Sequence, residues 1–208
     1  MRLTLKELKN VLELAASAYN PEDDSKVIKI ANEHKGYLTA KDLRVIFKWK
    51  LQPNHFISAE RQLMEYDSSH RGEIKQRTRL IVSSESDHHA LSILRGLPQM
   101  KTGPSVAVAS CLLMVLDINR FTVMDRRANE TLVAIKKILL SEESPSKELT
   151  QLRNLLISYG PPSDYLARAK DWPTYMAICR ELSNITGLTL REIDRALYSA
   201  SGKLYPDS

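Results

Sequence analysis

The chain has 208 residues, of which 43% are hydrophobic and 26% are charged, the balance of an ordinary globular protein. Glycine is scarce, with 7 residues, and aromatic residues make up 6%, which argues against a β-sandwich or a barrel. Leu, Ala, Lys, Arg and Glu dominate, which favours helices. The net charge of +5 permits an anionic partner without requiring one.

The cysteines and the apolar runs limit the class of protein further. Cys111 and Cys179 are too few for a disulfide framework or a four-thiolate cluster, so we expect two reduced core thiols in a cytoplasmic protein. The first residues carry charges inside any candidate apolar segment, which predicts no signal peptide. The longest apolar run, at 106–116, is too short to span a bilayer, so no membrane partner is expected.

The first half of the chain is predicted to form short helices. Thr4 caps the first, which ends before Pro21, and the second begins at residue 24 or 25 and ends at a C-cap on Gly36. Thr39 caps the third, which residues 51–54 end. Further helices are expected over residues 58–66, 73–82, 87–94 and 104–116.

The second half continues this pattern. A helix is expected from Asp125 or Arg126 through Leu139, and Thr189 with Glu192 forms a capping box for the last helix. No strand pattern of useful length is present. The sequence therefore predicts an all-α chain of roughly ten short helices, with later members at 147–157, 172–182 and 190–200.

Residues 94–125 form an ordered series of a turn, an apolar helix and a loop. Its parts are Leu97-Pro98, a polar turn at 99–105, the apolar run at 106–116 and a loop at 117–125 that ends on Asp125. This series resembles the helix-hairpin-helix, and the loop and aspartate that follow it, of the HhH-GPD base-excision DNA glycosylases. The likeness covers about 32 residues.

The resemblance implies one glycosylase-like domain over residues 1–208 with two lobes around a cleft. The hairpin would lie at about 87–116 and the aspartate loop at 117–125. The N- and C-terminal helices would pack together as a second lobe.

The resemblance also implies that the hairpin binds a DNA phosphate without reading a base. Helix N–H groups and the helix dipole attract an anion, and a glycine lets the backbone approach closely. The family turn usually reads Leu-Pro-Gly-Val-Gly, whereas this turn is longer and has Ser105 at the second glycine. The residues expected to contact DNA are Lys101, Thr102, Gly103, Ser105, Arg126 and Arg127.

One catalytic residue is implied, Asp125. Breaking a base–sugar bond builds positive charge on the deoxyribose, which a fixed carboxylate stabilises while it orients or deprotonates a water. Relatives with lyase activity carry a lysine early in the second hairpin helix, where this chain has Ala107. The resemblance therefore implies a monofunctional glycosylase with water as the nucleophile.

The expected partner is double-stranded DNA that holds a damaged or modified base, and a monomer is expected. Trp49 and Tyr66 are candidates for stacking on the extruded base, although core packing explains either one alone better. His88 and His89 are adjacent and point to different sides of a helix, so neither a metal nor a cofactor is expected.

Alternatives remain beside each of these predictions. The chain could be a non-catalytic helix-hairpin-helix DNA-binding protein or a helical protein-interaction domain. Asp125 could serve only as a helix N-cap, and Arg126 and Arg127 could form ion pairs with Glu130 instead of binding phosphates. The basic stretch at 75–79 is more often a solvated helix face than a DNA track.

Overall fold

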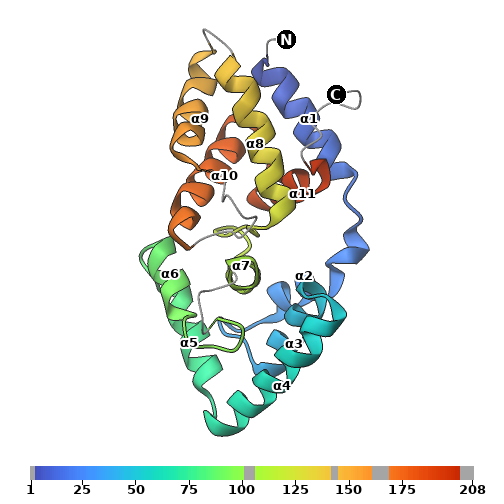
Figure 1. The fold of residues 1–208 in the computed structure, drawn as a ribbon, viewed down its shortest axis with the longest axis vertical. Helices are drawn as coiled ribbons and strands as arrows, with labels where there is room; N and C mark the ends of the chain where they lie inside the picture. The colour runs from blue at the N-terminus through green and yellow to red at the C-terminus, as the bar shows by residue number, and fades with distance from the viewer. Residues whose placement is uncertain (1–2, 101–105, 142–144, 161–168, 202–208) are drawn as a thin grey trace. The chain divides into compact units, whose positions relative to one another are not determined.

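The computed structural model describes residues 3–100, 106–141, 145–160 and 169–201. Within these ranges the chain forms eleven α-helices and two short 3-10 helices, and no strand (Figure 1). The predicted all-α class is confirmed.

The chain divides into two compact units. One, here called the internal unit, is Pro21–Val123, and the other, here called the terminal unit, joins Met1–Asn20 to Met124–Ser208. The hairpin segment belongs to the internal unit, and Asp125 belongs to the terminal unit.

The internal unit is organised around one buried helix. Helix α7 (Val106–Leu116) is apolar on every side, and all its residues except Ala107 are buried. A helix of this kind must be covered all round, and α7 packs against four other helices of the unit. These are α2 (Ser25–Glu33), α3 (Ala40–Lys50), α5 (Glu73–Val82) and α6 (Asp87–Ile93), while α4 (Pro53–Ser69) packs on α3.

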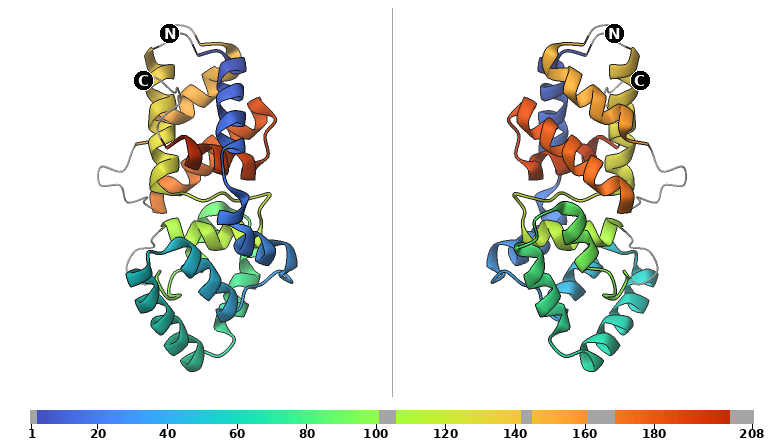
Figure 2. Two further views of the ribbon diagram at one scale, coloured as in Figure 1. Left: turned by 90° about the vertical axis from the view of Figure 1, so that its right-hand side faces the viewer. Right: turned by 90° about the vertical axis from the view of Figure 1, so that its left-hand side faces the viewer.

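The terminal unit joins the first helix of the chain to the helices of its second half (Figure 2). Its helices are α1 (Leu5–Ser17), α8 (Arg126–Ser141), α9 (Lys147–Ser158), α10 (Trp172–Thr186) and α11 (Leu190–Ala200). Helix α11 packs against both α1 and α8, and α10 packs against α9. Its core includes the fully buried side chains of Leu12, Trp172 and Leu197.

Three helices begin at threonines that the sequence predicts as caps, and each of these starts is a capping box. Thr4, Thr39 and Thr189 each accept a hydrogen bond from the backbone N–H three residues later, and the acidic side chain at that position bonds back to the cap N–H. This reciprocal pattern satisfies backbone donors that a helix start otherwise leaves unpaired.

Several predicted helix boundaries are wrong, among them the end of α10, which lies at Thr186 and not at residue 182. Helix α2 ends at Glu33 with His34 as its C-cap, whereas Gly36 lies in the following loop with φ 75°. Helix α4 begins at Pro53 and not at residue 58, because proline at the first helical position needs no hydrogen-bond partner for its nitrogen.

Among the described residues, no helix has the length and apolar character needed to cross a membrane. Cys111 and Cys179 are both buried and free.

Candidate functional site

The turn that leaves α6 is a tightly bonded segment of the internal unit. The N–H of Leu97 donates to the carbonyl of Leu94 at 3.1 Å, and the N–H of Met100 donates to the carbonyl of Leu97 at 2.9 Å. Gln99 has a positive φ of 67°, a conformation that side chains adopt rarely. The side chains of Leu94, Leu97, Pro98 and Met100 are buried, so the turn is anchored in the core.

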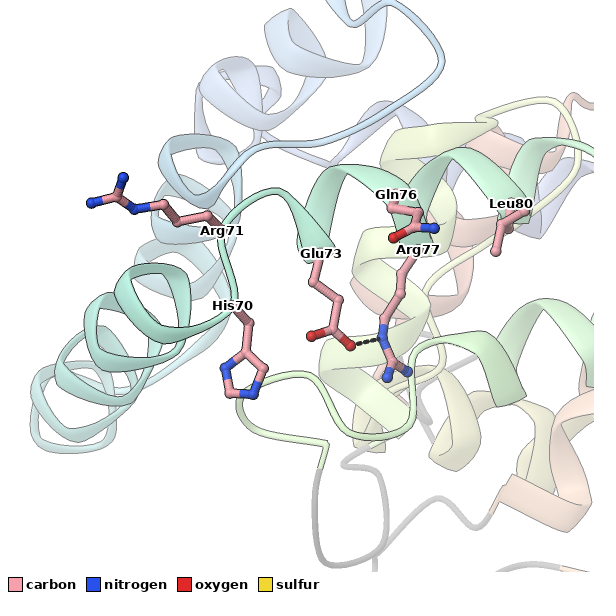
Figure 3. A pocket seen from close by; sticks show the side chains of 6 residues that line it. All are labelled: His70, Arg71, Glu73, Gln76, Arg77 and Leu80. Carbon is pink, nitrogen blue, oxygen red and sulfur yellow. Dashed lines mark hydrogen bonds and ion pairs between the residues drawn. The ribbon is translucent and has the colours of Figure 1, made fainter.

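Arg77 of α5 holds this turn by its carbonyl groups. Its Nη1 donates to the carbonyl of Ile93 at 3.2 Å and to that of Arg95 at 2.6 Å. Its Nε donates to Glu73 Oε1 at 2.6 Å, one helical turn earlier on α5 (Figure 3). The guanidinium therefore satisfies carbonyl groups at the C-terminal end of α6, where a helix leaves them without intrahelical partners.

Gly96 lies directly against this guanidinium. Its φ is +95°, and a Cβ at this position would lie 3.6 Å from Arg77 Nη1. That distance is an ordinary van der Waals contact, whereas the backbone conformation would strain any side chain here. The glycine is thus required by the conformation of the turn.

An open pocket of about 450 Å³ lies beside Arg77 (Figure 3). The residues that line it all come from α5 and the turn before it, and they are His70, Arg71, Glu73, Gln76, Arg77 and Leu80. Figure 3 shows His70, Glu73 and the Arg77 guanidinium on the same side of α5, while Arg71 points away from them.

Tyr66, the first candidate for base stacking, is buried next to this pocket. Its ring stacks on His70 with the ring centres 4.4 Å apart and an angle of 14°. Burial and a hydrogen bond to Glu73 raise the pKa of Tyr66, whereas hydrogen bonds from Arg77 and Tyr66 lower the pKa of Glu73. Only 7% of Tyr66 is exposed, and its stacking surface faces His70, as the core-packing alternative expects.

Trp49, the second candidate, is half-buried on α3. The ammonium group of Lys50 lies 5.8 Å from its ring centre. The role of Trp49 in base stacking stays a prediction.

The predicted phosphate-binding residues of the hairpin, Lys101, Thr102, Gly103 and Ser105, lie outside the described residues. The structure describes the segments on either side of them. The turn held by Arg77 comes before these residues, and α7, which starts at Val106, comes after them. Helix α6 also packs against α7.

Asp125 lies at the start of α8 in the terminal unit. Its Oδ1 accepts a hydrogen bond from the N–H of Ala128 at 3.0 Å, and its carbonyl accepts one from the N–H of Asn129 at 3.0 Å. Residues 121–124 before it are buried, whereas Asp125 itself is half-exposed. Asp125 therefore caps α8 and is itself only partly buried.

The two arginines after Asp125 have different neighbours. Arg126 Nε lies 2.7 Å from Glu130 Oε1, so the ion pair that the sequence offered as an alternative is present. The guanidinium carbon of Arg127 lies 4.7 Å from the ring centre of Tyr198, which makes an edge contact with Tyr19. Both arginines are exposed, and exposed ion pairs of this kind are weak.

No protein-family model matches the chain, and neither a curated protein nor a solved structure shows significant similarity to it. Among the residues that the structure describes, no group of three or more His, Cys, Asp or Glu side chains is arranged to hold a metal ion.

The sequence did not predict the role of Arg77 and Glu73. Their spacing of four residues on one helix is typical of an ion pair and was visible in the chain. Nothing in the sequence, however, indicates that the guanidinium reaches carbonyl groups 16 and 18 residues further on.

Proposed function

We propose that the chain is a monofunctional DNA glycosylase that hydrolyses the N-glycosidic bond of a damaged or modified base. The observation that carries the proposal is the state of Asp125, a partly buried residue whose carboxylate is held at the N-terminus of α8 by the N–H of Ala128. A carboxylate fixed in this way needs no reorientation when positive charge develops beside it.

The chemistry assigned to Asp125 is the stabilisation of the sugar cation. As the C1′–N bond lengthens, its electron pair leaves with the base and positive charge appears on the deoxyribose. Asp125 stabilises that charge and orients a water, whose oxygen then bonds to C1′ and keeps one hydrogen as the new sugar hydroxyl, while its other proton is released and the departing base takes up one proton. The base has to leave the helical stack before this step.

The turn after α6 supports the phosphate-binding part of the proposal. Arg77 and the buried leucines fix the chain that enters residues 101–105, and α7 begins directly after them. Backbone N–H groups at a helix start bind phosphate well when their position is set in advance. Such binding is independent of base sequence and weakens as salt rises.

Ala107 supports hydrolysis over lyase chemistry. A lyase needs an amine near the sugar to form a Schiff base, and this position of α7 carries a methyl group. We therefore assign the role of nucleophile to water.

The test is a panel of duplexes, each with a single modified base, incubated with the purified chain and then treated with alkali. The proposal expects strand breaks at one or more modified bases only after alkali, since hydrolysis leaves an abasic site with an intact backbone. Breaks that form without alkali would contradict a monofunctional enzyme.

The same panel separates the alternatives. Salt-dependent binding with no release of any base would favour a non-catalytic DNA-binding protein. The absence of both binding and release would favour a protein-interaction domain.

A further inference from the structure

Helix α5 carries a pair of cations on the side opposite Arg77. Lys75 and Arg79 are four residues apart and exposed, and at 100° per residue they lie on the helix face opposite Glu73 and Arg77. Neither forms an ion pair with a carboxylate among the described residues. This face is therefore separate from the pocket and from the turn that Arg77 holds.

Lys75 and Arg79 both lie against one aromatic ring. Lys75 Nζ lies 4.2 Å from the ring centre of Tyr37, and the guanidinium carbon of Arg79 lies 5.2 Å from the same centre. Both distances fall within the range of a cation–π contact.

The loop that carries Tyr37 is fixed to α5 by a buried threonine. The Oγ1 of Thr78 accepts the N–H of Leu38 at 2.9 Å and donates to the carbonyl of Ile74 at 2.8 Å. Thr78 and Leu38 are both fully buried. The position of the ring against Lys75 and Arg79 is thus set by the core and not by the surface side chains alone.

Two positive groups beside one ring repel each other. The negative face of the ring offsets part of this repulsion, and an anion placed between the cations would offset more. The spacing of Lys75 and Arg79 along the helix axis is about 6 Å, whereas one DNA strand carries a charge about every 3.4 Å of axis. Both cations can therefore contact phosphates of a single strand.

We propose that Tyr37, Lys75 and Arg79, here called the Tyr37 patch, bind the phosphate backbone of duplex DNA. This inference rests on the proposed function, because it adds a phosphate contact outside the hairpin to the same substrate. Lysine, arginine and the tyrosine hydroxyl are ordinary donors to phosphate oxygens and carry no base information. The patch would strengthen binding to every sequence alike.

The test compares a double variant, Lys75→Gln with Arg79→Gln, with a control that removes the same charge elsewhere. The control is Lys9→Gln with Lys29→Gln, two exposed lysines that already face Glu13 and Glu33. Binding to an unmodified duplex is measured over a range of salt concentrations. Both variants should keep the parent's melting temperature, because all four side chains are exposed.

The measured quantity is the slope of log K for DNA binding against log[salt]. Its magnitude should fall by about 1.8 in the double variant, since two phosphate contacts are lost at about 0.9 each, and should stay at the parent value in the control. Each single variant, Lys75→Gln or Arg79→Gln, should show about half of this change. A double variant with the slope of the control would overturn the Tyr37 patch, and so would a parent that binds no duplex. Binding to anionic lipid vesicles that depends on these residues, with unchanged DNA binding, would also overturn it.

Base release distinguishes this inference from the proposed function. If the double variant lowers the salt dependence of binding while the parent releases no base, the Tyr37 patch is supported and the glycosylase proposal is refuted. If the parent releases a base while the double variant and the control show the same salt dependence, the glycosylase proposal is supported and the Tyr37 patch is refuted.

Discussion

Glu73 connects α5 to the turn after α6 through Arg77. The carboxylate accepts the Arg77 Nε–H, and the same guanidinium donates to the carbonyl groups of Ile93 and Arg95. An ionised Glu73 thus orients the side chain that holds the turn. The stability of this part of the internal unit should depend on the charge of Glu73.

A pH dependence follows from the direction of the pKa shift. Hydrogen bonds from Arg77 and Tyr66 lower the pKa of Glu73 in the folded chain below its ordinary value of 4.5. The stabilisation is therefore present above the unfolded-state pKa and is lost as pH falls through the lower folded-state value. We expect Glu73→Gln to melt below the parent at pH 6, and the gap to narrow progressively as the pH is lowered below 4.5. Thermal melts over this range check this, and a gap that stays constant from pH 6 through the acid range would contradict it.

At the scale of single residues, the sequence predicts interactions between neighbours on one helix better than contacts between distant segments. The helix cap at Asp125 and the ion pair of Arg126 with Glu130 were alternatives to the catalytic and DNA-binding predictions, and both are present. The contact of Tyr37 with Lys75 and Arg79 joins segments about 40 residues apart and leaves no local pattern.

At the scale of helices, the capping threonines predicted three helix starts, and a capping box was recognised at one of them, Thr189 with Glu192. Glutamate or aspartate three residues after a threonine marks a helix start without any tertiary information. The start of α4 at Pro53 was missed because residues 51–54 contain both a helix stop and a helix start. Only the structure shows that the two helices follow each other with Leu51 and Gln52 between them.

The box at Thr189 provides a test at this scale. Thr189→Ala should lower the free energy of unfolding by about 1 kcal/mol, because the N–H of Glu192 loses its acceptor. The matched control is Thr150→Ala, an exposed threonine inside α9 whose hydroxyl donates to the carbonyl of Ser146. Urea denaturation measures both, and a loss in Thr189→Ala no larger than in the control would refute the assigned cap.

At the scale of the whole molecule, the sequence predicted the helical class, and the resemblance alone implied that the N- and C-terminal helices pack together. The run at 106–116 predicted a buried helix by composition alone, and α7 is buried. The contacts of α1 with α11 join residues at opposite ends of the chain, and an amphipathic pattern shows which face is buried without showing its partner.

Because α1 packs in the terminal unit, a substitution in its core-facing side should also destabilise helices far away in the sequence. Leu12 is 0% exposed, and Leu12→Ala should cost about 2–5 kcal/mol. Hydrogen exchange should become faster in α11 as well as in α1, since these helices pack together. Leu14→Ala, on the same helix but 70% exposed, is the control and should change neither. Faster exchange confined to α1 would contradict this account.

The central claim is that the charge of Asp125 promotes base release. Asp125→Asn removes that charge but keeps an oxygen that can accept the N–H of Ala128, so α8 stays capped. The matched control is Asp117→Asn, another half-exposed aspartate, whose Oδ1 accepts the N–H of Asn119 at 3.2 Å.

The measurement is the single-turnover rate of base release by the parent and both variants on a duplex from the panel, with DNA binding measured in parallel. We expect Asp125→Asn to slow release by about a hundredfold or more while binding stays equal or tightens, and Asp117→Asn to match the parent. Release by Asp125→Asn at the parent's rate, or a parent that releases no base from any duplex, would contradict the account.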